Sequence, residues 1–428
     1  MDHRTRPRAV RAVAALVALA LSPGLVACGG DDAAAPDSID VVTRWSAGNS
    51  AAAAQNRVFQ AFTAETGIKV NVTEGLETID DQVENAVAAG KSPDVVIVNL
   101  FDKTLGWLDA GVTVPVDQYV KDWGLADKIK PAALDEWRAG GKLQGLPFSG
   151  FSWPLWYNTE LLKQAGVDKI PATTDELIAA AAKLRAKGVA PLAVGGNDWT
   201  GQKFFYQVAQ SYTDAATMQK VMQQGGYCAT PSVLDGIKLF TQLRDAGVFV
   251  DNAAGLIADG MYAAYYSGKA AIMPAGSWAY TESTAAGTGI DKRTTLGGFP
   301  VPSGATFKKP TAYRGFTGVG FMITKRGAEP GRIDNLRKFI TKFYADASVG
   351  DFVKDSGILP PTTGDFAAYA TNPLLTQSLG LDVTVDYAVL PDVWIGSASD
   401  RIIQVLTGAY GKSTPQQICA GLDTATKG

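Results

Sequence analysis

Apolar and polar residues alternate along the first part of the chain in a way that predicts repeated strand–helix–strand units. We predict strands over 39–45, 68–73 and 94–99, with helices over 51–66 and 77–89 between them. The last of these strands (DVVIVN) is almost entirely β-branched and apolar, which is typical of a strand buried on both faces of a parallel sheet. This part of the chain is therefore expected to form an α/β domain.

A second series of the same kind begins near Phe151. Thr173 and Glu176 form a capping-box pattern that opens a helix over 174–187, with Gly188 after it. Thr230 and Pro231 likewise mark the start of a helix that runs to Ala246. The remaining predicted elements are strands over 155–158, 191–194, 270–274 and 318–324, a helix that ends at 165, helices over 330–344 and 394–410, a last helix from 415, and a polar loop over 308–313.

The length of the chain indicates more than one domain. With 428 residues, 46% of them hydrophobic, it exceeds the size at which a single hydrophobic core usually stops growing. We therefore expect two domains.

The N-terminus has the pattern of a secretory signal. Four arginines precede an apolar run over 12–21, which is too short to span a bilayer. The run leads to Leu25-Val26-Ala27-Cys28-Gly29, which resembles the lipobox at which bacterial lipoproteins are cleaved and acylated. We predict a signal peptide over 1–27, a lipid on Cys28, a flexible tether over 28–37, and a location on the extracytoplasmic face of the bacterial cell membrane. The alternative is an ordinary signal with an incidental cysteine.

Cleavage of the signal changes the charge and the available chemistry. It removes four arginines and one aspartate from 39 basic and 42 acidic residues, which leaves 35 and 41 and a net charge of −6. An acidic surface argues against a nucleic-acid partner. The only histidine, His3, leaves with the signal, so no histidine remains to activate a nucleophile or to bind a metal. We expect no cofactor, no metal and no catalysis.

Two cysteines remain, Cys228 and Cys419. A single pair in an oxidising compartment usually forms a disulfide, and we predict one here. Two unpaired buried thiols are the alternative.

Several segments, in order, resemble the family 1 extracellular solute-binding proteins, the group that includes maltose-binding protein. The most specific is GKLQGLPFSGFSWPLWYNTELLKQAG over 141–166, which runs into PATTDEL over 171–177. The others are FQAFTAETGIKV over 59–70 with SPDVV over 92–96, GKAAIMPAGSW over 268–278, FPVP over 299–302 and GILPP over 357–361.

The resemblance implies a periplasmic-binding-protein-like fold of type II, with two α/β lobes, a hinge and a ligand cleft between the lobes. The N-terminal lobe would comprise 38–150 and 315–357, and the C-terminal lobe 151–314 and 358–428. Both cysteines then fall in one lobe, which fits a disulfide. The implied function is that of a monomeric lipoprotein that captures a sugar, an oligosaccharide, and delivers it to the permease subunits of an ABC importer.

Sugars present flat apolar faces and rims of hydroxyl groups, so a sugar site needs aromatic side chains together with polar ones. Trp278 matches the stacking tryptophan of the family, with packing under the next helix as the alternative. Trp394 matches a second stacking position more loosely, and core packing is its alternative. Trp199 follows a predicted strand together with Asn197 and Asp198, at the strand end where open α/β sheets bind ligands.

Further candidates follow the strands expected in the N-terminal lobe. Trp45 and Ser46 end the first strand, and Asn99, Phe101 and Asp102 follow the third, where Asp102 is alternatively a helix cap. Arg314 lies at the expected return crossing, where a guanidinium can bond two hydroxyls. Trp153, Trp156 and Tyr157 surround the first crossing. Tyr157 and Asn158 match a family motif that we interpret as structural, so both are left out of the predicted site.

Other ligands and functions remain open at this point. A polyol, a glycerol phosphate or a small peptide fits the same fold, although a phosphate would need more basic residues than Arg314 and Arg44. A secreted glycoside hydrolase would need two carboxylates beside the scissile bond. Glu74 and Asp102 are available for this, but they carry no hydrolase pattern. A surface sensor or adhesin is the third alternative.

Overall fold

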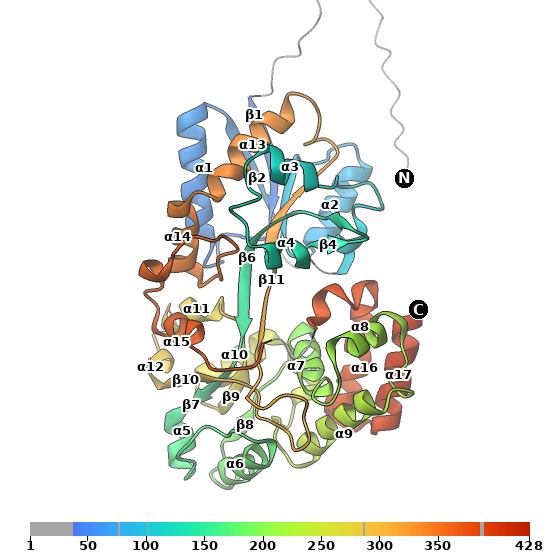
Figure 1. Cartoon of the computed structure of the whole chain (residues 1–428). Coiled ribbons are helices and arrows are strands. Elements are labelled where there is room, and N and C mark those ends of the chain that lie inside the picture. The colour runs from blue at the N-terminus through green and yellow to red at the C-terminus, as the bar shows by residue number, and fades with distance from the viewer. Residues whose placement is uncertain (1–36, 76–77, 101, 286, 386–388) are drawn as a thin grey trace, which may run out of the picture. The chain divides into compact units, whose positions relative to one another are not determined.

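The structure is a computed structural model of the chain that describes residues 37–75, 78–100, 102–285, 287–385 and 389–428 (Figure 1). The predicted signal peptide, the lipidated Cys28 and most of the tether lie outside these residues, as does Phe101. Within the described ranges, no helix is both long enough and apolar enough to cross a membrane.

The first sheet contains five strands in the order β2-β1-β3-β11-β6. The first three are parallel, whereas β11 runs antiparallel to both β3 and β6. All four residues of β3 are buried, as its β-branched sequence predicts. The strands are β1 (Ser38–Thr43), β2 (Lys69–Glu74), β3 (Val95–Val98), β6 (Leu146–Trp153) and β11 (Tyr313–Ile323).

Helices with one apolar face cover this sheet. Phe59 and Phe62 of α1 pack on Phe339 of α13 with ring centroids 5.5 and 5.3 Å apart, and α14 packs against both helices (Figure 1). The elements of this part are α1 (Ala52–Thr66), α2 (Ile79–Ala88), η1 (Asp102–Gly106), α3 (Asp117–Asp122), α4 (Pro131–Glu136), the hairpin β4 (Arg138–Ala139) and β5 (Lys142–Leu143), α13 (Arg332–Phe343) and α14 (Asp346–Ser356).

The second sheet contains four strands in the order β10-β7-β9-β8. Strands β8 and β9 are parallel, and β7 is antiparallel to β9 and β10. The strands are β7 (Leu155–Asn158), β8 (Ala190–Leu192), β9 (Ala270–Pro274) and β10 (Thr294–Gly297). The helices of this part are α5 (Thr159–Gln164), α6 (Thr174–Ala186), α7 (Trp199–Ala209), α8 (Ala215–Gln224), α9 (Pro231–Asp245), η2 (Ala253–Gly255), α10 (Ala258–Tyr266), α11 (Ala279–Ala285), α12 (Ile290–Arg293), α15 (Pro373–Leu379), η4 (Pro391–Val393), η5 (Gly396–Ala398), α16 (Ser399–Gly411) and α17 (Pro415–Lys427). The short turn η3 (Ala367–Tyr369) packs against α14 of the first part.

Strands β6 and β11 connect the two sheets (Figure 1). The second half of β11 lies between β3 and β6 in the first sheet, and its first half pairs with β6 alone, Tyr313 opposite Trp153 and Gly315 opposite Phe151. The register shifts between Gly315 and Val319, as at a β-bulge. After Trp153 a single residue, Pro154, separates β6 from β7 of the second sheet.

Most of the predicted elements are present. Strands β7 and β9 have the predicted bounds, and both hydrogen bonds of the Thr173–Glu176 capping box form. The prediction for Thr230 was wrong in one respect. Helix α9 starts at Pro231, but the Thr230 hydroxyl donates backwards to the Gly226 carbonyl at 2.8 Å and does not cap the helix.

Three further differences lie near the crossing strands. The predicted helix over 394–410 begins only at Ser399, after the short turns η4 and η5. The predicted strand over 318–324 is the second half of the longer β11, and β6 was not predicted. The predicted boundaries between the lobes stay a prediction.

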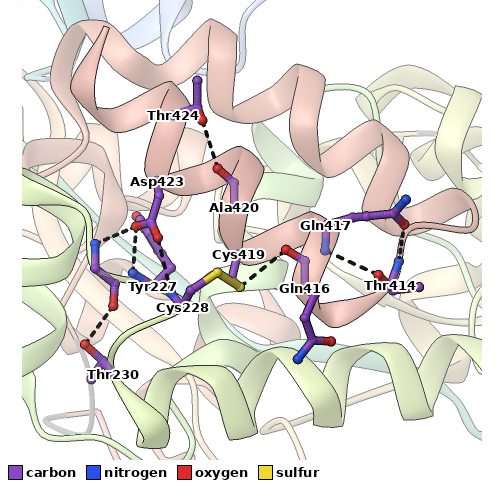
Figure 2. Close-up of a disulfide and its surroundings, with 11 residues drawn as sticks. Tyr227, Cys228, Thr230, Thr414, Gln416, Gln417, Cys419, Ala420, Asp423 and Thr424 are labelled. Carbon is purple, nitrogen blue, oxygen red and sulfur yellow. Dashed lines mark hydrogen bonds between the residues drawn. A yellow bond between two sulfur atoms is a disulfide. The ribbon is translucent and has the colours of Figure 1, made fainter.

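A disulfide joins Cys228 to Cys419 of α17 (Figure 2). The Cα atoms of the two cysteines lie 5.0 Å apart. Next to the bond, the Asp423 carboxylate accepts hydrogen bonds from the main-chain N–H groups of Gly226, Tyr227 and Cys228. The last helix is therefore held to the loop before α9 by a covalent bond and by a charge-assisted set of hydrogen bonds.

Candidate functional site

Three tryptophans from separate elements are in mutual contact, and we call them the tryptophan cluster. The ring centroids of Trp153 and Trp199 lie 5.4 Å apart, those of Trp153 and Trp278 5.6 Å, and those of Trp199 and Trp278 5.9 Å. Trp153 ends β6, Trp199 opens α7, and Trp278 follows β9. The rings meet at 49° to 63°, which are tilted and edge-on arrangements rather than flat stacks.

The tryptophan cluster is part of a small apolar group beside the main hydrophobic core, and Trp278 packs against both. Two of its residues, Phe151 and Tyr313, come from the paired ends of β6 and β11. Phe307 and Ala305 come from the loop before β11, and Leu390 comes from the segment before η4. The group therefore gathers side chains from beside the β6–β11 crossing and from around the second sheet.

The indole of Trp278 is fixed from two sides. A Cβ placed on Gly276 would lie 2.2 Å from the Trp278 ring, so the ring folds back over a position that only glycine can occupy. The indole N–H of Trp278 donates to the Tyr262 hydroxyl at 3.2 Å. Trp278 is half-buried, so part of its ring remains accessible.

Trp153 is the buried member of the tryptophan cluster, with 0% exposure. The ammonium group of Lys203 lies 5.6 Å from the Trp153 ring centroid and 4.6 Å from that of Phe151, in cation–π contact with both. The Trp153 indole nitrogen is buried and has no hydrogen-bond partner among the described residues. An unmatched buried donor of this kind costs about 1–3 kcal/mol.

The two half-buried members, Trp199 and Trp278, provide the accessible ring faces, with Trp153 as their support. Such an arrangement suits a ligand that has flat apolar faces and hydrogen-bonding edges.

Asn197 and Asp198, which precede Trp199, are engaged in the fold. Asp198 caps α7, accepting from the Thr200 N–H at 2.8 Å, and it also accepts from the Ala258 N–H at the start of α10. Burial raises the pKa of the Asp198 carboxyl. The Asn197 side chain is exposed and accepts from the Thr407 hydroxyl. Both residues therefore position Trp199, and their predicted role in ligand binding remains a prediction.

Asn99 lies at the end of β3, beside the crossing strands. Its side-chain oxygen is buried and has no hydrogen-bond partner among the described residues, and the same holds for the Thr317 hydroxyl of β11. The two residues lie close together, because the Leu100 N–H donates to the Thr317 carbonyl at 3.2 Å. Asp102, the first residue of η1, follows after Phe101. The Asn99 side-chain oxygen and the Thr317 hydroxyl are thus two neighbouring buried polar groups with no hydrogen-bond partner among the described residues.

Trp45 and Ser46 are not among the described residues of the apolar group that contains the tryptophan cluster. Trp45 is 5% exposed, and its ring packs against Phe148 and Phe352 in the main core. Ser46 is half-buried beside it.

Arg314 and Trp394 are not among the described residues of the apolar group that contains the tryptophan cluster. Because side chains alternate along a strand, Arg314 of β11 faces away from Tyr313, and its guanidinium donates to the Ser378 carbonyl of α15 at 3.4 Å. Trp394 follows η4, is half-buried, and packs against the main core. The structure thus brings Trp199 and Trp278 together and adds Trp153, which was left out of the predicted site.

Within the described ranges, no three His, Cys, Asp or Glu side chains gather in a way that would hold a metal ion. The polar groups near the tryptophan cluster include the Asp198 carboxylate, the Tyr262 hydroxyl and the Lys203 ammonium.

Comparison with known proteins identifies the family. The model of the bacterial extracellular solute-binding proteins matches residues 47–349. The chain therefore belongs to the bacterial extracellular solute-binding protein family, a family of binding proteins, as the sequence motifs predicted. It is similar to the crystal structure of a probable secreted solute-binding lipoprotein from Streptomyces coelicolor, with 35% identity, a TM-score of 0.80, and coverage of 92% of this chain and 99% of that one.

Two further similarities are informative. A chitin oligosaccharide binding protein has a TM-score of 0.74 at 23% identity, with coverage of 91% of this chain and 98% of that one. The predicted two-lobe α/β fold is confirmed by such matches. A probable sugar-binding periplasmic protein of Rhizobium meliloti is 30% identical over 261 residues, which are 58% of this chain and 60% of that protein. The chain spans about half the length of the first curated relatives that it matches.

Proposed function

We propose that this protein captures a sugar, an oligosaccharide, outside the cytoplasm and delivers it to the permease of an ABC importer. The tryptophan cluster is the observation that carries the proposal. Two half-buried indoles, Trp199 and Trp278, can cover the apolar faces of pyranose rings, and the buried Trp153 supports both of them from behind. The names of similar proteins, which include a chitin oligosaccharide binding protein and probable sugar-binding periplasmic proteins, support a sugar over the other ligands.

We further propose that the protein is a binder and not an enzyme. A glycoside hydrolase needs two carboxylates beside the scissile bond. Asp198, the carboxylate next to Trp199, already accepts hydrogen bonds from Thr200 and Ala258. The chemistry around the tryptophan cluster is that of recognition, in which each polar group of the ligand must find a partner.

A thermal-shift screen of the signal-less protein against mono- and oligosaccharides tests the proposed ligand class, with calorimetry on each hit. A bound sugar raises the melting temperature with its concentration, because it binds the folded state only. Chromatography of the same mixtures separates the two functions. An unchanged sugar supports the binder, and new shorter products support the hydrolase. Binding of a peptide or of glycerol phosphate, with no sugar bound, would overturn the proposal.

The lipid anchor at Cys28 is a separate part of the proposal and rests on the lipobox-like sequence. Substitution Cys28→Ser removes the thiol to which a diacylglycerol would be attached. We expect the parent to incorporate labelled fatty acid and to remain with the membrane, and the variant to do neither. Equal membrane association of both proteins would contradict the anchor and leave the sugar proposal intact.

A further inference from the structure

Leu390 covers the crossing strands next to the tryptophan cluster. A Cβ placed on Gly315 would lie 2.3 Å from the Leu390 Cδ1 atom and 3.1 Å from the Glu136 Oε2 atom. Leu390 therefore rests directly on the backbone of β11, at a position where the strand has no side chain. Leu390 is also one of the residues packed against the apolar group that contains Phe151, Trp153 and Tyr313.

The position of Leu390 divides one face of the crossing strands into two parts. Phe151 and Trp153 of β6 and Tyr313 of β11 share this face, because they pack in one group. Arg314, between Tyr313 and Gly315, faces the other side and bonds to Ser378. On one side of Leu390 is the tryptophan cluster. Further along β11 is Thr317, in the middle of the strand, with its neighbour Asn99; their polar atoms are buried and lack partners among the described residues.

A buried glutamine at the C-terminal cap of α7 holds the segment that carries Leu390. Gln210 is 0% exposed, and its side-chain amide pairs with both main-chain groups of Val389. It accepts from the Val389 N–H at 2.8 Å and donates to the Val389 carbonyl at 3.1 Å. The same amide nitrogen donates to the Tyr313 hydroxyl at 3.1 Å. Gln210 therefore fixes Val389, the residue before Leu390, to the end of α7 and to β11. The three hydrogen bonds are buried and so protected from water.

We propose that Leu390 limits the length of the sugar that the protein accepts, and that Gln210 is the positioning residue that keeps Leu390 there. The inference rests on the proposed function. A sugar stacked on Trp199 and Trp278 meets Leu390 before it reaches Asn99 and Thr317. Truncation of Leu390 removes this obstacle, and a longer ligand then has access to the unpartnered oxygen of Asn99 and the hydroxyl of Thr317. Leu390 would thus determine specificity through exclusion rather than through attraction.

The test is calorimetric titration of the parent and of Leu390→Ala with a series of linear oligosaccharides of increasing length from the class that binds the parent. We expect the affinity of Leu390→Ala for the next longer member, relative to the best ligand of the parent, to rise at least tenfold. Leu390→Met, which keeps the side-chain volume, should retain the length preference of the parent. Leu379→Ala is the matched control, because this leucine of α15 is 50% exposed and is not part of the apolar group.

Gln210→Glu tests the positioning role. It keeps an acceptor for the Val389 N–H but loses the donor to the Val389 carbonyl and to Tyr313. We expect a shift toward longer sugars in the same direction as for Leu390→Ala, but smaller. A lower melting temperature with an unchanged length preference would show that Gln210 only stabilises the fold, and would overturn its part of the proposal.

The outcomes distinguish a failure of the role of Leu390 from a failure of the proposed sugar binding. If the parent binds no sugar of any length, the proposed function fails, and the inference fails with it. If the parent binds sugars and Leu390→Ala shows the same ratio of affinities along the series, only the role of Leu390 is overturned.

Discussion

The ring centroids of Trp153 and Trp278 lie 5.6 Å apart, with their planes inclined by 49°. Trp153 ends the strand that crosses between the two sheets, whereas Trp278 follows β9, one of the two inner strands of the second sheet. Their contact therefore depends on the packing of two distant parts of the chain. Trp153 is fully buried, and Trp278 remains partly accessible, so that one ring supports the other.

Substitution of either accessible ring should weaken sugar binding. We expect Trp278→Ala and Trp199→Ala each to lower the affinity for a bound sugar at least tenfold, which is about 1.4 kcal/mol, because each removes a stacking surface. Calorimetry on the best ligand from the sugar screen measures the loss. Trp123→Ala is the control, since this ring stacks on Tyr119 with centroids 5.0 Å apart and lies outside the tryptophan cluster. An equal loss in the control would argue against stacking.

The substitution Gly276→Ala should displace a ring without removing it. The added methyl group would lie 2.2–2.5 Å from three carbons of the Trp278 indole, so the ring has to turn away from Trp153 and Trp199. We expect a clear loss of sugar affinity in calorimetry. Gly255→Ala, where a Cβ meets no atom within 4 Å, should bind like the parent. Normal binding by Gly276→Ala would mean that the orientation of Trp278 is unimportant.

Removal of the disulfide should affect stability and not binding. The double variant Cys228→Ala and Cys419→Ala loses a link between residues 191 positions apart. We expect a fall of about 2–4 kcal/mol in the free energy of unfolding, measured with denaturant. Its sugar affinity should match that of the parent, because neither cysteine belongs to the apolar group of the site. A reductant should lower the free energy of unfolding of the parent and leave that of the double variant unchanged. The reverse result would exclude the disulfide.

An exposed ion pair should make the fold mildly sensitive to acid. Asp117 of α3 bonds to the Arg138 guanidinium at 2.6 Å and to the Leu143 N–H at 2.9 Å. Partial burial raises the pKa of Asp117, but these two bonds outweigh it and hold the pKa below its ordinary value of 3.8. The stabilisation is therefore complete above pH 3.8 and is lost as the pH falls below it.

The variant Asp117→Asn has no carboxyl group at this position, so its stability lacks this dependence on pH. At pH 7 it should be less stable than the parent, by less than about 1 kcal/mol because the pair is exposed to solvent. The difference should shrink as the pH falls from 5 toward 2, as measured by chemical denaturation at each pH. A difference that grows in acid would contradict the role of the carboxylate.

The elements with strong local signals were predictable from the sequence. The capping box at Thr173 and Glu176 and the buried strand β9 need no information from distant residues. Strand β6 was missed because all eight of its residues are buried, so it has no polar face. Its sequence, LPFSGFSW, also contains a proline, a glycine and two serines, which obscure a β pattern.

The site was predictable only in part. Trp199 and Trp278 follow strand signals, and a position after a strand is visible in the sequence. The same argument selected Trp45, whose ring packs on Phe148 and Phe352, and its role in ligand binding stays a prediction. Trp153 has no local mark either, because its contacts with Trp199 and Trp278 form only when β6 and β9 are in place.

The register shift in β11 has a mechanical consequence. Between Gly315 and Val319 the regular hydrogen-bond ladder to β6 is interrupted. Before this interval β11 pairs with β6 alone, and after it β11 pairs with both β6 and β3. A bulge concentrates bending and twist at one point of a strand. Deformation at this point strains fewer main-chain hydrogen bonds than it would in an unbroken ladder. The interruption thus gives β11 a point at which deformation is easier, and this point begins at Gly315, the residue on which Leu390 rests.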